Sequence, residues 1–248
     1  MNPNIETVYT PELYKYHNQC QNVVLIDVAR FTSTMVTALA NGAVSVETYP
    51  DKETPLRLKE ERGYLIAGEH RGLNIEGYDY NNSPLSMTRG NVAGRRLAFC
   101  TSNGTYARSI ISGSETIFAA SFLNSSAVAG KLISEGKSVM FLCSGRDRKP
   151  AVEDILLAGQ LAEKLLESGK FQTGDESTNM AIKLYNLAKD DIKGFTMSMY
   201  PRMAYMASRH PAFAADIDFA LCNQDIYDIV PMETSELSFS AANGKNIK

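Results

Sequence analysis

The chain has 248 residues, of which 44% are hydrophobic and 21% charged, so it can bury a core as one large domain or two small ones. Its net charge is −3 and its isoelectric point about 5.7, and no basic stretch stands out, so we expect neither nucleic acid nor an anionic membrane as a partner. No run approaches the roughly 18 apolar residues of a membrane span. The first ten residues lack an apolar signal core, so we expect a cytoplasmic protein.

Short apolar runs alternate with amphipathic stretches along the chain. The expected strands are residues 23–28, 43–49, 64–67, 97–100, 116–120, 138–143, 217–221 and 227–230. The expected helices are residues 34–40, 52–62, 105–111, 126–135, 152–167 and most of 180–214, the last divided at Gly194, Pro201 and Pro211. This alternation predicts one α/β domain over residues 1–234, with a mainly parallel or mixed sheet, helices on both faces and hence three layers. We expect residues 235–248 to form a polar C-terminal tail.

Residues 71–91 break this regular alternation. The segment is rich in Gly and Asn and shows little hydrophobic periodicity. Structureless loops of this length are uncommon in compact domains unless they bind something, so we predict a functional loop.

Three further loops, at residues 27–34, 101–105 and 144–150, follow predicted strands and lead into helices. In parallel sheets, ligands bind where the carboxyl ends of the strands meet. Helix N-termini offer free N–H groups and a partial positive charge, which favour phosphate or sulfonate. We therefore expect an anion site formed by these loops.

In the first loop, Asp27 follows four apolar residues. A buried unpaired carboxylate is costly, so Asp27 should have a metal or another cation as its partner. Arg30 can hold a phosphate through two parallel hydrogen bonds. Ser33 and Thr34 either bind the anion or only start a helix.

The second loop contains Asn103-Gly104, a frequent turn dipeptide. Because Thr101 and Thr105 flank it, the loop is also a candidate oxyanion cradle.

Three acidic residues extend the predicted site. Glu153 and Asp154 lie in the first turn of a predicted helix, where acids stabilise the helix dipole, so that structural role is an alternative to catalysis. Glu69 follows a short strand at the start of the long loop and has no such structural explanation.

The sequence contains no P-loop, no G-x-G-x-x-G, no H-E-x-x-H and no G-x-S-x-G pattern. This argues against a P-loop NTPase, a simple dinucleotide-binding enzyme, a zincin and a standard α/β-hydrolase.

Six segments nevertheless carry a family resemblance: residues 27–43, 68–69, 77–84, 101–105, 121–124 and 143–159, with Val230-Pro231 after them. In this order they resemble the signatures of the 2-phosphosulfolactate phosphatase (ComB) family, over about residues 20–232. Departures at positions 29, 31, 80, 81, 102 and 144 spare the predicted metal and phosphate residues. They alter the loops that would shape the leaving group.

The resemblance implies a Mg²⁺-dependent hydrolase that converts 2-phosphosulfolactate, a small anionic phosphate ester, to sulfolactate and phosphate, a step of coenzyme M synthesis. The predicted catalytic residues are Asp27, Arg30 and Glu153. The predicted metal ligands are Asp27, Glu69, Glu153 and Asp154. The predicted substrate-binding residues are Arg30, Ser33, Thr101, Asn103, Gly104, Thr105, Arg71 and Arg146.

Several alternatives stay open. Asp27 could attack phosphorus and form an aspartyl phosphate, or a metal-bound water could attack directly. The substrate could be a phosphorylated hydroxy acid without a sulfonate, and the chain could also be a non-catalytic anion-binding protein. The Met- and Tyr-rich segment 197–206 either packs on the core or forms a homo-oligomeric interface.

Overall fold

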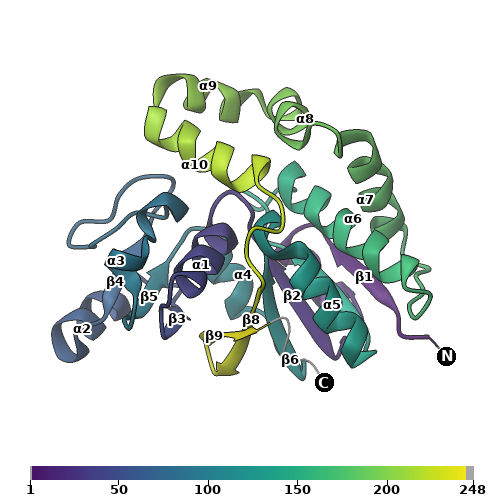
Figure 1. The fold of residues 1–248 in the computed structure, drawn as a ribbon, viewed down its shortest axis with the longest axis horizontal. Helices are drawn as coiled ribbons and strands as arrows, with labels where there is room; N and C mark the ends of the chain where they lie inside the picture. The colour runs from purple at the N-terminus through teal and green to yellow at the C-terminus, as the bar shows by residue number, and fades with distance from the viewer. Residues whose placement is uncertain (1, 244–248) are drawn as a thin grey trace.

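The computed structural model describes residues 2–243 and is built on a mixed nine-stranded sheet, in the order β1-β7-β2-β6-β8-β9-β3-β5-β4 (Figure 1). One parallel block consists of β1 (Ile5–Val8), β7 (Val139–Cys143), β2 (Asn22–Ile26) and β6 (Thr116–Ala120). The other consists of β3 (Ser45–Thr48), β5 (Arg96–Cys100) and β4 (Leu65–Gly68). Between them lies the antiparallel hairpin of β8 (Ile229–Ser235) and β9 (Ser238–Asn243), which pairs with β6 and with β3.

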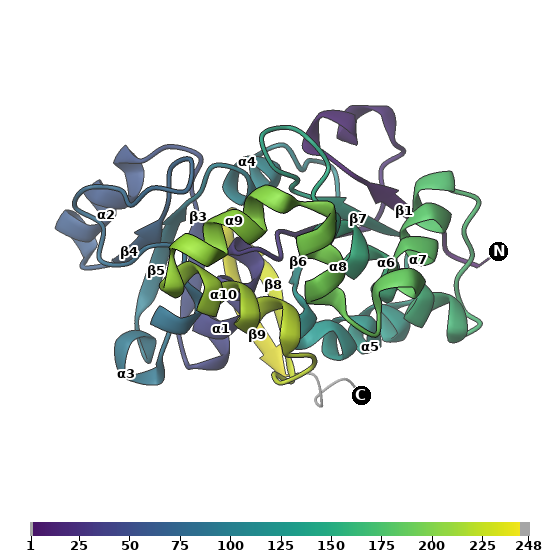
Figure 2. The ribbon, with the colours of Figure 1, turned by 90° about the horizontal axis from the view of Figure 1, so that it is seen from above.

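The α-helices of the described part are α1 (Phe31–Ala40), α2 (Glu53–Arg62), α3 (Arg89–Val92), α4 (Gly104–Ser109), α5 (Ser125–Glu135), α6 (Val152–Glu167), α7 (Glu176–Ala188), α8 (Ile192–Met199), α9 (Pro201–Arg209) and α10 (Pro211–Cys222). Three 3₁₀ helices, η1 (Pro11–Tyr16), η2 (Pro84–Ser86) and η3 (Phe122–Asn124), complete the list. Figure 1 shows α8, α9 and α10 as an arch over one end of the molecule, and Figure 2 shows the same three helices crossing above the sheet. Among the described residues, no helix is both long enough and apolar enough to cross a membrane.

Strand β2 explains why helices cover both faces of the sheet. Its side chains alternate between two core clusters: Val24 and Ile26 join the cluster that contains Leu161 of α6, whereas Leu25 joins the one that contains Met35 of α1. A strand buried on both faces reads as a continuous apolar run, which is what the sequence shows. The predicted α/β fold is confirmed.

Capping residues explain where the predicted helical segment 180–214 divides into separate helices. Pro201 and Pro211 each begin a new helix, as predicted, because proline is tolerated in the first turn. The predicted division at Gly194 was wrong, since Gly194 lies inside α8. There its amide donates to the carboxylate of Asp191, the N-cap residue, at 2.8 Å.

Two further predictions were wrong. Residues 217–221 are part of α10, where Ile217, Ala220 and Leu221 are buried at helical spacing. The predicted tail contains β9, because Phe239 is fully buried and opposite Val46 of β3. Positions 244–248 of that tail lie outside the described residues, and the edge strand β1 was not predicted.

Candidate active site

The three predicted loops meet at one end of the sheet. The amide of Ser144, after β7, donates to the carbonyl of Ile26 at the end of β2 at 2.7 Å. The amide of Asp147 in the same loop donates to Oδ1 of Asn103, after β5, at 3.3 Å. Segments more than a hundred residues apart in the chain therefore form one surface, as the strand-end rule predicts.

Asp27 lies at the centre of this surface. The residue is 8% exposed, and its Oδ1 accepts the amide of Phe31 at 3.2 Å. Its Oδ2 faces Gly104 so closely that a Cβ atom at that position would lie 2.7 Å from it. Gly104 therefore acts by its small size, which lets the carboxylate lie against the start of α4.

The environment of Asp27 disfavours its charge. Burial raises the pKa of Asp27 to about 7, opposed by the hydrogen bond from the Phe31 amide. The neighbouring carboxylates of Glu69 and Glu153 also raise this pKa, whereas the Arg146 guanidinium lowers it. Additional positive charge beside such a carboxyl favours its ionised form and lowers its pKa.

Glu153 comes from the first turn of α6 and is 1% exposed. Its Oε1 accepts a short hydrogen bond from Nη2 of Arg146, whose guanidinium lies over the ring of Tyr200 at 4.2 Å. Its Oε2 is buried and has no hydrogen-bond partner among the described residues. Buried polar atoms are nearly always paired, so this oxygen marks a place for a bound group.

Asp154 and Glu69 are buried as predicted, but backbone amides hold them. Oδ1 of Asp154 accepts the amide of Val28 at 2.8 Å and Oδ2 accepts that of Gly145 at 3.1 Å, so Asp154 ties two loops together. Burial, followed by the charges of Glu153 and Asp27, raises the pKa of Asp154 well above its usual value.

Glu69 joins the long loop to the loop after β5. Its Oε1 accepts the amide of Ser102 at 2.8 Å, and its Oε2 accepts that of Gly72 at 2.5 Å. Because amides contact both carboxylate oxygens, Glu69 shapes the loops, as Asp154 does, and the role of both residues as metal ligands stays a prediction.

These contacts decide which groups fit a divalent cation. Within residues 2–243, no three acidic, His or Cys side chains lie close enough together to form a metal centre by themselves. Among the four predicted metal ligands, Asp27 and Glu153 each keep one carboxylate oxygen, Oδ2 and Oε2, without a hydrogen bond to the described residues. Such a donor set fits Mg²⁺, which typically takes one or two carboxylates and completes its shell with water and substrate phosphate.

Arg30 begins α1 after a cis peptide bond with Ala29. Its Nη1 donates to Oδ2 of Asp216 in α10 at 2.6 Å, and its guanidinium lies 5.3 Å from the ring of Phe213. The sequence analysis missed Asp216. Its only signal is an acid within the apolar stretch 212–221.

Several predicted substrate-binding hydroxyls are engaged within the protein. Ser33 is fully buried, and its Oγ donates to the carbonyl of Val28 at 2.8 Å. Oγ1 of Thr105 donates to the carbonyl of Thr101 at 2.7 Å, and Oγ1 of Thr101 accepts the Thr105 amide at 3.2 Å. These hydrogen bonds fix the shape of the loops, and the binding of substrate by these hydroxyls stays a prediction.

The remaining predicted basic residues point to different places. Arg71 is exposed in the long loop, where its amide donates to Oγ of Ser102 at 2.6 Å. Arg146 lines a cavity of about 470 Å³ between the loop after β7 and the helices α6 to α9. That cavity is also lined by Lys149, Arg202 and Tyr200 and by the apolar side chains of Ile155, Leu184 and Met199.

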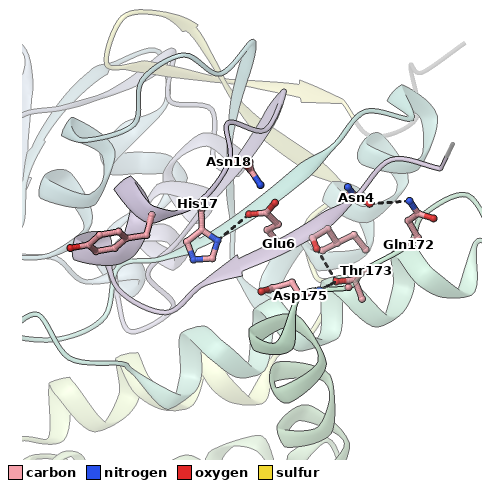
Figure 3. Close-up of a pocket in the computed structure, with 10 residues that line it drawn as sticks. Asn4, Glu6, His17, Asn18, Gln172, Thr173 and Asp175 are labelled. Atoms are coloured by element: carbon pink, nitrogen blue, oxygen red, sulfur yellow. Dashed lines mark hydrogen bonds and ion pairs between the residues drawn. The ribbon is translucent and has the colours of Figure 1, made fainter.

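A second cavity, of about 660 Å³, lies beside β1 and the segment before α7 (Figure 3). Nδ1 of His17 lies 3.0 Å from Oε2 of Glu6 there, and Asp175 lines the opposite side. None of the predicted site residues lines this cavity.

Comparison with known proteins agrees with the motif pattern. A model of the family described as 2-phosphosulpholactate phosphatase matches residues 8–236. A protein of Caldanaerobacter subterraneus subsp. tengcongensis named "Probable 2-phosphosulfolactate phosphatase" is 34% identical over 218 residues, covering 85% of this chain and 87% of that protein. Proteins of the same name from Prochlorococcus marinus and Thermotoga maritima are each 34% identical, over 221 and 213 residues, covering 85% and 86% of this chain and 88% and 89% of their own.

Proposed function

This chain belongs to the 2-phosphosulfolactate phosphatase family, and from that premise we propose that it hydrolyses the phosphate monoester of a small anionic 2-hydroxy acid with Mg²⁺. The observation that carries the proposal is the pair of buried carboxylates Asp27 and Glu153, each with one oxygen that has no hydrogen bond to the described residues, with Arg146 paired to Glu153 and its charge also acting on Asp27. A protein that only held an anion would gain nothing from free carboxylate oxygens beside its ligand.

The substrate that fits best is 2-phosphosulfolactate, which the names of the relatives state for those proteins. Its leaving group carries a carboxylate and a sulfonate. The cavity beside Arg146 is lined by Arg202 and Lys149, which carry positive charges, and by apolar side chains. Neither cation has an ion-pair partner within the described chain, so both are available to an anionic leaving group.

In this proposal Oδ2 of Asp27 and Oε2 of Glu153 would hold the cation. When bound, Mg²⁺ would neutralise phosphoryl charge and make water a better nucleophile. The N–H groups of Arg30 that do not contact Asp216 bind phosphoryl oxygens, together with the amides at Asn103 and Gly104. Arg146 compensates the charge of Glu153 and guides the leaving group.

We favour direct attack by water over an aspartyl phosphate. Oδ1 of Asp27 is held by the Phe31 amide, and Oδ2 is the oxygen assigned to the metal. Direct attack inverts the configuration at phosphorus, whereas two successive displacements retain it. Hydrolysis of a substrate with a chiral, isotopically labelled phosphoryl group therefore distinguishes the two routes.

The test of the function is phosphate release from 2-phosphosulfolactate and a panel of small monoesters, with Mg²⁺ and with excess EDTA. We expect release that needs Mg²⁺ and is lost in Asp27→Asn and Glu153→Gln. Glu163→Gln, a change on the outer side of α6 where Glu163 accepts from Asn186, is the matched control. Absence of release from every ester in the presence of Mg²⁺ contradicts the proposal and leaves the anion-binding alternative.

A further inference from the structure

The ion pair between Arg30 and Asp216 is shielded from water. The side chain of Arg30 is 10% exposed and that of Asp216 is 3% exposed, and their contact atoms lie 2.6 Å apart. The Phe213 ring covers the guanidinium from the same helix, α10. A charged contact in such an environment is short, strong and geometrically defined.

Asp216 is itself fixed by a second contact. Oγ of Ser83 donates to its Oδ1 at 2.5 Å, and both side chains are buried. The carboxylate thus connects the loop before α1, the long loop and α10, whose sequence positions differ by 186 and 133 residues. Figure 1 shows α10 lying across the end of the molecule next to α1.

This arrangement engages only one nitrogen atom, Nη1, of the Arg30 guanidinium in a hydrogen bond. One hydrogen bond and one aromatic ring set the plane of the guanidinium, and its Nε and Nη2 groups make no hydrogen bond within the described residues. An arginine side chain gives up much rotamer entropy when it is ordered, so a protein partner that orders it beforehand reduces the cost of ligand binding.

The negative charge of Asp216 also has a cost for anion binding, because it offsets the positive charge of Arg30. Removing the carboxylate therefore has two opposite effects on a bound phosphate. Loss of orientation weakens binding, and loss of the opposing charge strengthens it. The sign of the measured change shows which effect dominates.

We propose that Asp216, held by Ser83, is a positioning residue that orients Arg30 toward the phosphoryl group. The inference rests on the proposed function, in which Arg30 binds phosphoryl oxygens. Neither the sequence motifs nor the family assignment points to Asp216, which acts through its contact with Arg30.

The experiment compares wild type, Asp216→Ala, Asp216→Asn and Asp218→Ala. Asp218 lies on the same helix but pairs with Lys193 on the surface at 2.7 Å, so it is a matched control. Binding of inorganic phosphate is measured by titration calorimetry with MgCl₂ present, and KM and kcat are measured with the best ester of the panel.

We expect Asp216→Ala to weaken phosphate binding roughly 10- to 100-fold, since charge-assisted hydrogen bonds contribute at this level. KM should rise more than kcat falls. Asp216→Asn, which can still accept from Arg30 and contact Ser83, should recover most of the affinity, and Asp218→Ala should match wild type.

Equal or tighter phosphate binding by a folded Asp216→Ala protein overturns the inference. If that variant does not fold, Ser83→Ala takes its place, and unchanged KM and phosphate affinity in a folded Ser83→Ala protein overturn the inference. Phosphate binding requires no turnover, so a wild type that binds phosphate but hydrolyses no ester refutes the proposed function separately. A wild type that binds no phosphate refutes the positioning role as well.

Discussion

Arg146 neutralises Glu153 through only one of its two carboxylate oxygens. Nη2 of Arg146 donates to Oε1, while the buried Oε2 is left without a partner among the described residues. Removing a charge from water is costly unless it is paired, and here the pairing is half complete. The arginine thus compensates the charge of the carboxylate through Oε1 and leaves Oε2 for a second cation.

Glu153→Gln should therefore raise the Mg²⁺ concentration needed for half-maximal activity by at least roughly 10- to 100-fold, the range known for groups that support a metal. The same variant should bind Mn²⁺ more weakly in an electron paramagnetic resonance titration, which requires no turnover. Equal Mn²⁺ affinity in wild type and Glu153→Gln would remove Glu153 from the metal site.

Gly104→Ala tests the contact between the start of α4 and Asp27. The added Cβ would overlap the ring of Phe31 and lie 2.7 Å from Oδ2 of Asp27, so the carboxylate must move. We expect a loss of about 1–3 kcal/mol in unfolding free energy and about a 100-fold loss in kcat/KM.

Gly130→Ala is the matched control for that change. Nothing lies within 4 Å of a Cβ at this position of α5, so stability should stay equal or rise by up to about 1 kcal/mol. The unfolding free energy of both variants is measured by urea denaturation. If Gly104→Ala has full activity, Asp27 does not need its present position.

The raised pKa of Asp27 makes the stability of the metal-free protein pH-dependent. Its pKa is about 7 when folded and near 3.8 when unfolded, so between these values the folded state binds more protons. Stability should accordingly fall as pH rises from about 4 to about 7 and stop changing for this group above that.

Asp27→Asn removes this contribution. In EDTA, the stability of Asp27→Asn relative to wild type should be greater at pH 8 than at pH 5, as measured by urea unfolding. If the unfolding free energies of the two proteins differ by the same amount at both pH values, the pKa of Asp27 is not raised in the folded protein.

Arg108 and Glu233 form a pair that concerns stability alone. Their side chains are 8% and 9% exposed, Nε of Arg108 donates to Oε2 of Glu233 at 2.8 Å, and Nη2 makes a second, shorter contact with Oε1. The pair fastens α4 to β8. Glu233→Ala should cost about 3–5 kcal/mol, because it leaves a buried guanidinium unpaired.

The double variant Arg108→Met with Glu233→Met should recover much of that loss. KM should change little in either protein, since neither residue lines the site. A Glu233→Ala protein with wild-type stability would show that water replaces the carboxylate.

Arg202→Gln tests the leaving-group cavity. We expect KM for 2-phosphosulfolactate to rise roughly 10-fold, as for the loss of one charged hydrogen bond, and KM for p-nitrophenyl phosphate to stay the same. Arg209→Gln, which changes an arginine of the same helix that stacks on Tyr205, serves as control. An equal rise in KM for both esters would place Arg202 outside the leaving-group contact.

The sequence predicted the parts of this molecule that depend on local pattern. Strands β2 and β7 are buried along their whole length and so appear as unbroken apolar runs. The polar loops after them could be found because the residues that follow parallel strands all lie at the same edge of the sheet. Strand β9 could not be found, since Phe239 is the one large apolar residue in the sequence of residues 238–243.

The hydrogen bonds and ion pairs of the site residues depend on tertiary contacts, which no local sequence pattern shows. Glu69 and Asp154 look like metal ligands in the sequence, and only the folded backbone shows amides directed at their oxygens. Arg30 meets Asp216 only because α10 returns over α1 late in the chain. Residue types suggest candidate groups, and the hydrogen bonds of the folded chain show which of their atoms are already engaged.

The hairpin of β8 and β9 has a consequence for synthesis on the ribosome. All strands of both parallel blocks precede residue 144, yet the hairpin that joins β6 to β3 is made only from residue 229 onward. Until then a nascent chain presents two open strand edges, and such edges pair readily with other chains. Strands β8 and β9, translated after both blocks, therefore cover these open edges, and we expect chains that stop before residue 229 to aggregate.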